Sequence, residues 1–427
     1  MNSTGTKSSG IAPLNNRDFR LLLGGFAMGQ MLMPLQFFTQ ILWVQENAPK
    51  HIWLVLVALI GASRGIGALT FGLYGGALAD RFDRRQLLLV TQFLLMLTTL
   101  VIALVMLFSN GSALTFCVFF VFTFLSAGLQ SIDAPTRLAL VPDILGPLLT
   151  PAGMSLNQVA GQLAMPLALF GTGFIIEAVG FGSTYLFSAV GHLVVIACLA
   201  LMTYRKVKEK GAATRDKYGF KDAIGDVRYG LRYARHHSVV LWVIVLLVCM
   251  MGLGFPATAN LGPTWLTTVV GVSIAHVGMV AMTWGIGALI AAVGLTWFSS
   301  FEHRGALIAG GSILFSISFF IFAIDHTVFN AVIGNLGLGA GMTITMVSST
   351  ILIQRIVPNE VRGRIMSIFQ LNMGFAQLMT MPVAALGQWF TLQVLFPILA
   401  AMTVIIVLTI LVTQPQLRKA RVDNTEP

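Results

Sequence analysis

The stretch Gly76-Ala77-Leu78-Ala79-Asp80-Arg81-Phe82-Asp83-Arg84-Arg85 places five charged side chains between two long apolar runs. Each of these runs, residues 52–78 and 86–108, can cross a hydrocarbon core of about 30 Å as a helix that rises about 1.5 Å per residue. A short charged turn between two such runs is typical of a connection at a membrane surface. The stretch therefore predicts a helical membrane protein.

The composition of the whole chain supports this prediction. Of the 427 residues, 56% are apolar and 10% are charged, whereas a soluble domain carries about 25% charged residues. The abundance of aliphatic and aromatic residues excludes a disordered chain. Cys117, Cys198 and Cys249 each lie inside an apolar run, which argues against a disulfide framework or a thiolate metal site.

The apolar runs predict an all-α membrane protein with twelve transmembrane helices. Each run is long enough to span the bilayer. The predicted spans are residues 21–44, 52–78, 86–108, 114–133, 152–176, 183–204, 239–261, 274–298, 306–324, 329–353, 365–390 and 392–412.

The basic residues give the orientation of these spans. Lys50 and Arg64 are the two of the 26 Lys and Arg residues that fall away from the side of the membrane that holds both termini. Because positive residues stay in the cytoplasm, both termini are predicted to be cytoplasmic. The net charge of +10 is thus a signal of topology, and nucleic acid is not a predicted partner.

The sequence predicts two six-helix halves, residues 1–204 and 239–427, joined by a basic cytoplasmic linker at 205–238. The two halves share weak internal similarity, because Leu140-Val141-Pro142-Asp143 corresponds to Ile356-Val357-Pro358-Asn359. Such repeats are typical of secondary transporters, whose substrate sites lie between the halves. The linker is predicted to form a surface helix near residues 220–233, and contact with anionic lipid is favoured over a regulatory site.

The charged stretch from Gly76 to Arg85 resembles the signature loop of the major facilitator superfamily, Gly-x-x-x-Asp-Arg-x-Gly-Arg-Arg. Asp83 replaces the second glycine of that pattern. Together with twelve spans and a central linker, the resemblance covers nearly the whole chain. It implies a transporter that works by alternating access.

The resemblance also implies a gate on the cytoplasmic side. Gly76 would let two helices approach closely, and Asp80 would face the N-terminus of the helix that begins near residue 365. Arg84 is expected to pair with Asp133. The alternative is that the charges only fix the topology of the chain. This alternative is sufficient to explain Arg81 and Arg85. The other predicted gate residues are Arg362 and Arg364.

Two further elements narrow the resemblance. Val357-Pro358-Asn359-Glu360-Val361-Arg362-Gly363-Arg364, taken with Val141-Pro142-Asp143, is similar to the bacterial branch that includes enterobactin exporters and multidrug efflux proteins. Gly161-Gln162-Leu163-Ala164-Met165-Pro166 resembles the Gly-x-x-x-Gly-Pro element of proton antiporters, with Met165 in place of the second glycine. A proline-kinked packing helix is the alternative for this element.

The candidate substrate-binding residues are mostly neutral amides, methionines and aromatic residues in the spans that line the cavity of this superfamily. Such a set suits a bulky amphipathic substrate, although several of these amides could instead tie helices together. The candidates are Gln30, Gln36, Phe37, Gln40, Arg64, Gln158, Gln162, Phe255, Trp284, Asn335, Met342, Met346, Gln370 and Gln377.

Charged residues within the spans are few. An arginine in mid-helix costs about 2.5–3.5 kcal/mol on insertion scales, so Arg64 is expected either to bind an anionic or carbonyl-rich substrate or to pair with helix carbonyls or an acid. The candidates for proton coupling are Asp133, Glu46, Glu177 and His192, and packing is the favoured role for His192.

The predicted function is export of drug-like compounds or siderophores by proton antiport. The alternatives are uptake by the same fold, or a lipid scramblase or membrane sensor. The chain is predicted to be a monomer in the bacterial inner membrane, with a small molecule, protons and lipid as partners. It is not predicted to be an enzyme or to bind a metal or cofactor. The sequence contains no Gly-x-x-x-x-Gly-Lys-Ser/Thr loop, which argues against ATP as the direct energy source.

Overall fold

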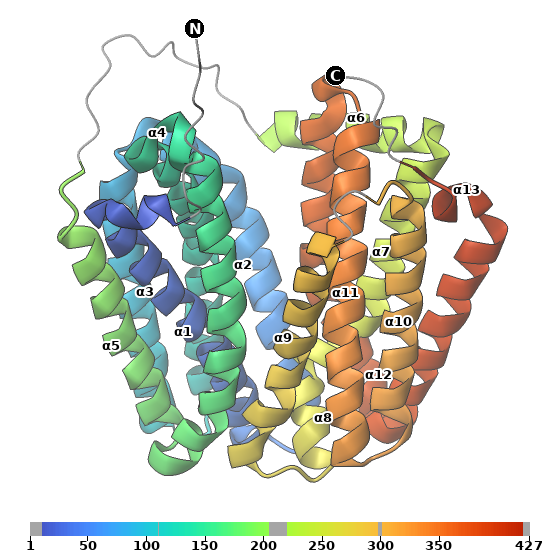
Figure 1. Ribbon diagram of the computed structural model, residues 1–427. Helices are drawn as coiled ribbons and strands as arrows, with labels where there is room; N and C mark the ends of the chain where they lie inside the picture. The colour runs from blue at the N-terminus through green and yellow to red at the C-terminus, as the bar shows by residue number, and fades with distance from the viewer. Residues whose placement is uncertain (1–10, 110, 205–219, 298–300, 422–427) are drawn as a thin grey trace, which may run out of the picture. The chain divides into compact units, whose positions relative to one another are not determined.

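The computed structural model describes residues 11–109, 111–204, 220–297 and 301–421, and within these ranges every regular element is a helix (Figure 1). The side chains at positions 73–77, 79–81, 220–224, 226–227, 359–360, 367, 370–371 and 373 lie outside the description. The predicted all-α fold is confirmed.

The helices follow one another from a short 3-10 turn to a short C-terminal helix. In order they are η1 (Ala12–Asn15), α1 (Arg17–Asn47), α2 (Trp53–Arg81), α3 (Arg84–Leu107), α4 (Ala113–Val179), α5 (Phe181–Ala200), α6 (Phe220–His236), α7 (Ser238–Phe255), η2 (Pro256–Asn260), α8 (Gly262–Thr268), α9 (Ile274–Trp297), α10 (Arg304–Ile324), α11 (Val328–Ile356), α12 (Asn359–Thr413) and α13 (Pro415–Arg418).

Ten helical segments in the described part of the chain are long and apolar enough to span a membrane. Two of the helices to which they belong are far too long for one crossing: α4 has 67 residues and α12 has 55, which correspond to about 100 and 80 Å of helix. Each contains one residue with non-helical backbone, Gly146 (φ 69°) and Thr391 (φ 60°). Each therefore consists of two arms, in the places where two spans were predicted.

The chain forms two compact units. Unit 1 comprises Met1–Phe37, Gly67–Ala168 and Val179–Lys217, and unit 2 comprises Phe38–Ile66, Leu169–Ala178 and Tyr218–Pro427. The helices α1, α2 and α4 thus contribute to both. The assignment of residues 1–204 and 239–427 to two separate halves stays a prediction.

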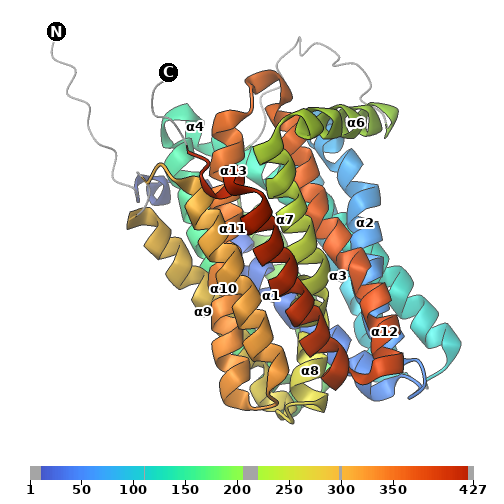
Figure 2. The same ribbon diagram turned by 90° about the vertical axis from the view of Figure 1, so that its right-hand side faces the viewer.

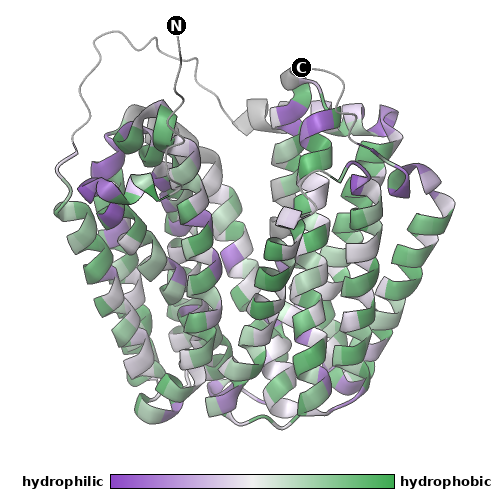
Figure 3. Ribbon diagram, in the orientation of Figure 1, coloured by the Kyte–Doolittle hydropathy of each residue, from purple (hydrophilic) through white to green (hydrophobic). Residues whose placement is uncertain are grey.

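In unit 1, α3 and α5 pack against each other, and a cluster of fully buried side chains, including Phe19, Leu88, Leu140 and Val195, joins them to α1 and α4. Large apolar side chains such as Phe93 of α3 remain exposed. Hydrophobic residues dominate the long helices, while hydrophilic residues gather near helix ends (Figure 3). This distribution is what a lipid-facing surface requires.

In unit 2, α10 and α11 pack closely, and α9 lies against α11. The helix α6 crosses one end of these long helices in contact with α7 and α12, and α8 lies at the other end (Figures 1 and 2). The predicted surface helix at 220–233 is confirmed by α6. The predicted span 239–261 agrees with one candidate membrane helix, Ser238–Asn260, in which α7 continues from Phe255 into the π-helical turn η2.

Candidate functional site

The charged turn between α2 and α3 is fixed by hydrogen bonds within unit 1. Asp83 caps the N-terminus of α3 by accepting a bond from the Gln86 backbone N–H, a role that glycine at that position could not fill. Arg84 Nη1 donates to Asp143 Oδ2 over 2.7 Å and to the Ala139 carbonyl over 2.9 Å. The turn is therefore tied to the first arm of α4.

The predicted pairing of Arg84 with Asp133 is wrong. Asp133 pairs instead with Arg137 on the same helix, with 3.1 Å between Nη2 and Oδ2. The prediction ended the fourth span at residue 133, but the helix continues past Pro135 to Gly146. The continued helix places Asp143 beside Arg84, and Arg137 can be buried there because Asp133 neutralises it.

Arg85 caps the C-terminal end of α5. Its guanidinium donates to the carbonyls of Leu199, Ala200 and Tyr204, where α5 ends, and a cation is favoured at a helix C-terminus. Burial, and then the nearby Asp143 carboxylate, raise the pKa of the Tyr204 phenol. Arg85 thus has a structural partner, beyond the role in topology that the sequence allowed.

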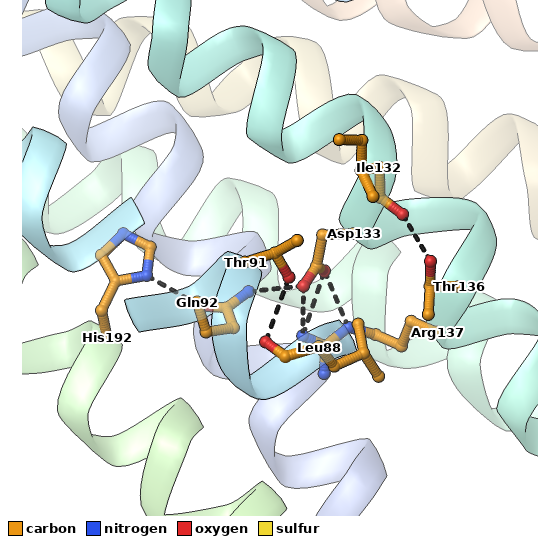
Figure 4. Close-up of polar contacts among 8 residues, drawn as sticks. All are labelled: Leu88, Thr91, Gln92, Ile132, Asp133, Thr136, Arg137 and His192. Atoms are coloured by element: carbon orange, nitrogen blue, oxygen red, sulfur yellow. Dashed lines mark hydrogen bonds and ion pairs between the residues drawn. The ribbon is translucent and has the colours of Figure 1, made fainter. Parts of the chain in front are cut away.

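A chain of hydrogen-bonded polar side chains connects α5, α3 and α4 in unit 1 (Figure 4). His192 Nδ1 lies 2.9 Å from Gln92 Oε1, and Gln92 Nε2 donates to Asp133 Oδ1 over 2.8 Å. On the other side of the ring, Gln36 Nε2 of α1 lies 3.2 Å from His192 Nε2. The structure therefore brings two predicted coupling residues, Asp133 and His192, into one hydrogen-bonded chain through Gln92.

In unit 2, segments from the first part of the chain pack closely against α8 and α9. Gln45 Nε2 of α1 donates to Thr267 Oγ1 of α8 over 3.0 Å. Gly173 of α4 lies against the start of α9, and a Cβ on Gly278 would lie 2.0 Å from the Leu169 carbonyl oxygen. The backbones of α4 and α9 thus touch at two glycines.

A cluster of amides lies near the same end of unit 2. Asn260 ends the π-helical turn, and its Nδ2 donates to Gln377 Oε1 over 2.9 Å and to Thr380 Oγ1 over 2.5 Å. Gly61 of α2 lies against this pair, because a Cβ there would be 3.0 Å from Gln377 Oε1 and 3.2 Å from Asn260 Nδ2. We call the contacts of α1, α2 and α4 with α8, α9, η2 and α12 in unit 2 the seam.

The predicted substrate-binding residues differ in their surroundings. Gln36 and Gln40 are buried at 1% exposure each, and Asn335 is buried with its Nδ2 donating to the Val280 carbonyl. Gln158 is exposed, and the Gln370 side chain lies outside the described set. Met342 is also buried, and the half-buried members are Gln30, Phe37, Arg64, Gln162, Phe255, Trp284, Met346 and Gln377.

The remaining predicted gate residues are placed in part. The side chains of Gly76, Asp80 and Arg81 lie outside the description. Arg362 Nη2 donates to the Val357 carbonyl, and the Arg364 guanidinium lies 4.6 Å from the centre of the Tyr229 ring of α6. Of the other coupling candidates, Glu46 and Glu177 are exposed.

Sequence reasoning missed four residues that the structure makes central: Gln92, Asp143, Asn260 and Gly278. Gln92 and Asn260 are polar residues inside predicted spans, which is a usable signal for function. Asp143 was quoted in the repeat but given no partner. Gly278 carries no signal, because its importance comes from its contact with the backbone of Leu169, which is distant in the sequence, and hydrophobic periodicity does not reveal such a contact.

Comparisons with known proteins agree with this fold. Residues 21–381 match the Major Facilitator Superfamily profile. The chain is 21% identical over 390 residues to the staphyloferrin A transporter of Staphylococcus aureus (strain NCTC 8325 / PS 47), covering 91% of this chain and 92% of that protein.

Solved structures with the same fold include a mutant of the nucleoside transporter NupG (TM-score 0.75, 11% identity, 93% of this chain and 99% of that one). Another is a POT family transporter in complex with a thioalcohol conjugated peptide (TM-score 0.72, 12% identity, 94% and 96%). Because the superfamily profile covers most of its length, this multi-pass membrane protein belongs to the Major Facilitator Superfamily.

Proposed function

We propose that this protein is a secondary active transporter that exports a small amphipathic molecule, either a drug-like compound or a siderophore, in exchange for protons. It works by alternating access in a bacterial inner membrane with both termini in the cytoplasm. The observation that carries the proposal is the seam in unit 2.

The seam has the chemistry of a contact that opens and closes. Its hydrogen bonds join neutral groups, such as Gln45 with Thr267 and Asn260 with Gln377, and its closest approaches are glycines against backbone. Parting neutral groups leaves no buried unpaired charge, whereas breaking a buried ion pair costs about 3–5 kcal/mol. The seam also joins segments from both sides of the linker, as alternation between two openings requires.

The surroundings of the candidate binding residues support an amphipathic substrate. Half-buried Phe255, Trp284 and Met346 offer adaptable apolar contacts, and the amide of Gln377 offers hydrogen bonds. The relative that transports staphyloferrin A supports the siderophore class over other small molecules. The structures of nucleoside and peptide transporters share the fold and add nothing about the substrate.

Flux in membrane vesicles tests the proposal. Everted vesicles, energised to be acidic inside, would receive fluorescent drugs, catechol siderophores or staphyloferrin A, and substrate entry and collapse of the pH gradient would be recorded together. Entry coupled to release of protons is the expected result. Uptake confined to right-side-out vesicles would show that the protein imports its substrate. Flux that needs no gradient would favour a scramblase.

The Asp80→Asn variant tests the predicted gate in the same vesicles. Vesicles that contain the Asp80→Asn variant should hold the same amount of inserted protein, because the change is isosteric. We expect slower transport in that variant, since Asp80 is a predicted gate residue. Equal rates in the two preparations would reject the gate assignment.

A further inference from the structure

We propose that His192 binds the proton that drives transport, and that Gln36 on α1 responds to its charge. This inference rests on the proton coupling proposed above and names the site for it. It is carried by the direction of each hydrogen bond in the chain from Asp133 to Gln36.

The direction is set at Asp133. Asp133 forms an ion pair with Arg137 at 3.1 Å, and the carboxylate of an ion pair can only accept hydrogen bonds. The Gln92 side chain must therefore point its NH₂ group at Asp133, as the 2.8 Å bond from Nε2 shows. Its carbonyl oxygen, Oε1, then faces His192 at 2.9 Å.

The same constraint fixes the tautomer of His192. Because Gln92 Oε1 can only accept, His192 Nδ1 must carry the hydrogen, and a neutral imidazole then has Nε2 as a bare acceptor. Gln36 Nε2 lies 3.2 Å from that nitrogen and also donates to Thr99 Oγ1 over 3.4 Å. His192 is 5% exposed and Gln92 4%, so both side chains are shielded from bulk solvent in this conformation.

A proton can enter this arrangement at one atom and change one bond. A proton taken from solution forms an N–H bond at Nε2, and the ring becomes a cation with two donors. The bond from Nδ1 to Gln92 is kept. The Gln36 amide must turn to present Oε1, because two donors repel each other, and release of the proton on the other side of the membrane restores the first orientation.

Among the described residues, the charged groups that act on the ring are Asp133 and Arg137, both on α4. The helices α1 and α3, which also pack against the ring, present the neutral side chains Gln36, Gln92 and Thr99. The net charge of the surrounding groups is therefore zero before the proton arrives. The bound proton adds one positive charge to the ring, and the Gln36 amide turns in response to it.

The position of Gln36 explains how a proton could affect transport. Helix α1 passes from unit 1 to unit 2 after Phe37, so Gln36 is the second-last residue of α1 within unit 1. Farther along α1, Gln45 bonds to Thr267 in the seam. A turn of the Gln36 amide acts on the same helix that helps to close the seam.

The His192→Gln variant tests the proposal in proteoliposomes. Glutamine offers one donor for Gln92 and one acceptor for Gln36, but it takes up no proton in the physiological pH range. We expect exchange of labelled for unlabelled substrate within about twofold of wild type, because exchange needs no net proton movement, and accumulation driven by a pH gradient at least tenfold lower. The matched control is His236→Gln on the exposed surface of α6, which should retain both.

The outcomes separate the site from the function. Gradient-driven accumulation by His192→Gln at the wild-type rate would overturn the site and leave proton coupling standing. Wild-type protein that transports substrate without moving protons would overturn both. Equal loss of exchange and accumulation in a folded His192→Gln variant would assign His192 a structural role and also overturn the proposal.

A second measurement reads the tautomer of His192 in the wild-type protein. Nitrogen-15 NMR of histidine-labelled protein in lipid nanodiscs distinguishes the two neutral tautomers, and the His192 signal is assigned by its loss in His192→Gln or His192→Asn. We expect the form with hydrogen on Nδ1. A signal from the form with hydrogen on Nε2 would overturn the polarity of the chain and, with it, the proposed entry of the proton.

Discussion

Arg84 Nη1 lies 2.7 Å from Asp143 Oδ2, and this ion pair joins the start of α3 to the first arm of α4 just before the break at Gly146. The side chains are 20% and 23% exposed, so the pair is only partly shielded from water. The same Arg84 nitrogen donates to the Ala139 carbonyl. The arginine of the signature turn is thus anchored to a helix arm within unit 1.

Asp143→Asn should weaken this anchor. Because both groups are partly solvated, we expect a loss of about 1 kcal/mol in stability and slower transport, measured by thermal unfolding in detergent and by vesicle flux. The exchanged pair Arg84→Asp with Asp143→Arg should recover part of the loss, since the opposite charges face each other again. A double variant no better than the single ones would contradict a role for the pair.

Gly278→Ala should prevent the close contact of α4 with α9. A Cβ at Gly278 would lie 2.0 Å from the Leu169 carbonyl oxygen, and two backbones cannot yield as a flexible side chain can. We expect at least a tenfold loss of transport with normal membrane insertion. The control is Gly294→Ala on the same helix, where nothing lies within 4 Å of the added carbon; similar losses in the two variants would show a general effect on α9.

Asn260→Ala should loosen the amide cluster of the seam. The change leaves Gln377 Oε1 and Thr380 Oγ1 without the donor they now share, and each buried polar group that loses its partner costs about 1–3 kcal/mol. We expect a lower midpoint of thermal unfolding and slower transport. The control is Asn47→Ala, because Asn47 is exposed and donates to a carbonyl of its own helix; this change should affect neither stability nor transport. An Asn260→Ala variant as stable as Asn47→Ala would show that the amide cluster does not stabilise the protein.

Periodicity and hydropathy predicted the elements well, because lipid demands long apolar helices with satisfied backbones. The predicted 274–298 and 306–324 agree with α9 and α10 within two residues. The prediction failed at the end of the fourth span, which was placed at residue 133: Asp133 neutralises Arg137, and the helix continues past Pro135.

Partners within the site were harder to predict than the elements. Which acid, Asp133 or Asp143, forms the ion pair with Arg84 depends on where α4 breaks. Sequence spacing alone allows either acid to reach Arg84. The bond between Gln92 and His192 joins residues 100 positions apart. Such contacts follow from the packing of α3 on α5, which the sequence pattern leaves unspecified.

Arg64→Ala should separate the two roles that the sequence allows for this arginine. Arg64 is half-buried on α2, between Gly61 and Gly65, and both glycines lie against Gln377. If the guanidinium binds substrate, the alanine variant should lose transport of anionic compounds at least about tenfold while neutral compounds keep their rates, because one charge-assisted hydrogen bond is worth about 1.5–3 kcal/mol. Arg64→Lys keeps the charge and should retain part of the anion transport. Equal losses for anionic and neutral compounds, measured as initial rates in vesicles with matched protein amounts, would assign Arg64 to the packing of α2 instead.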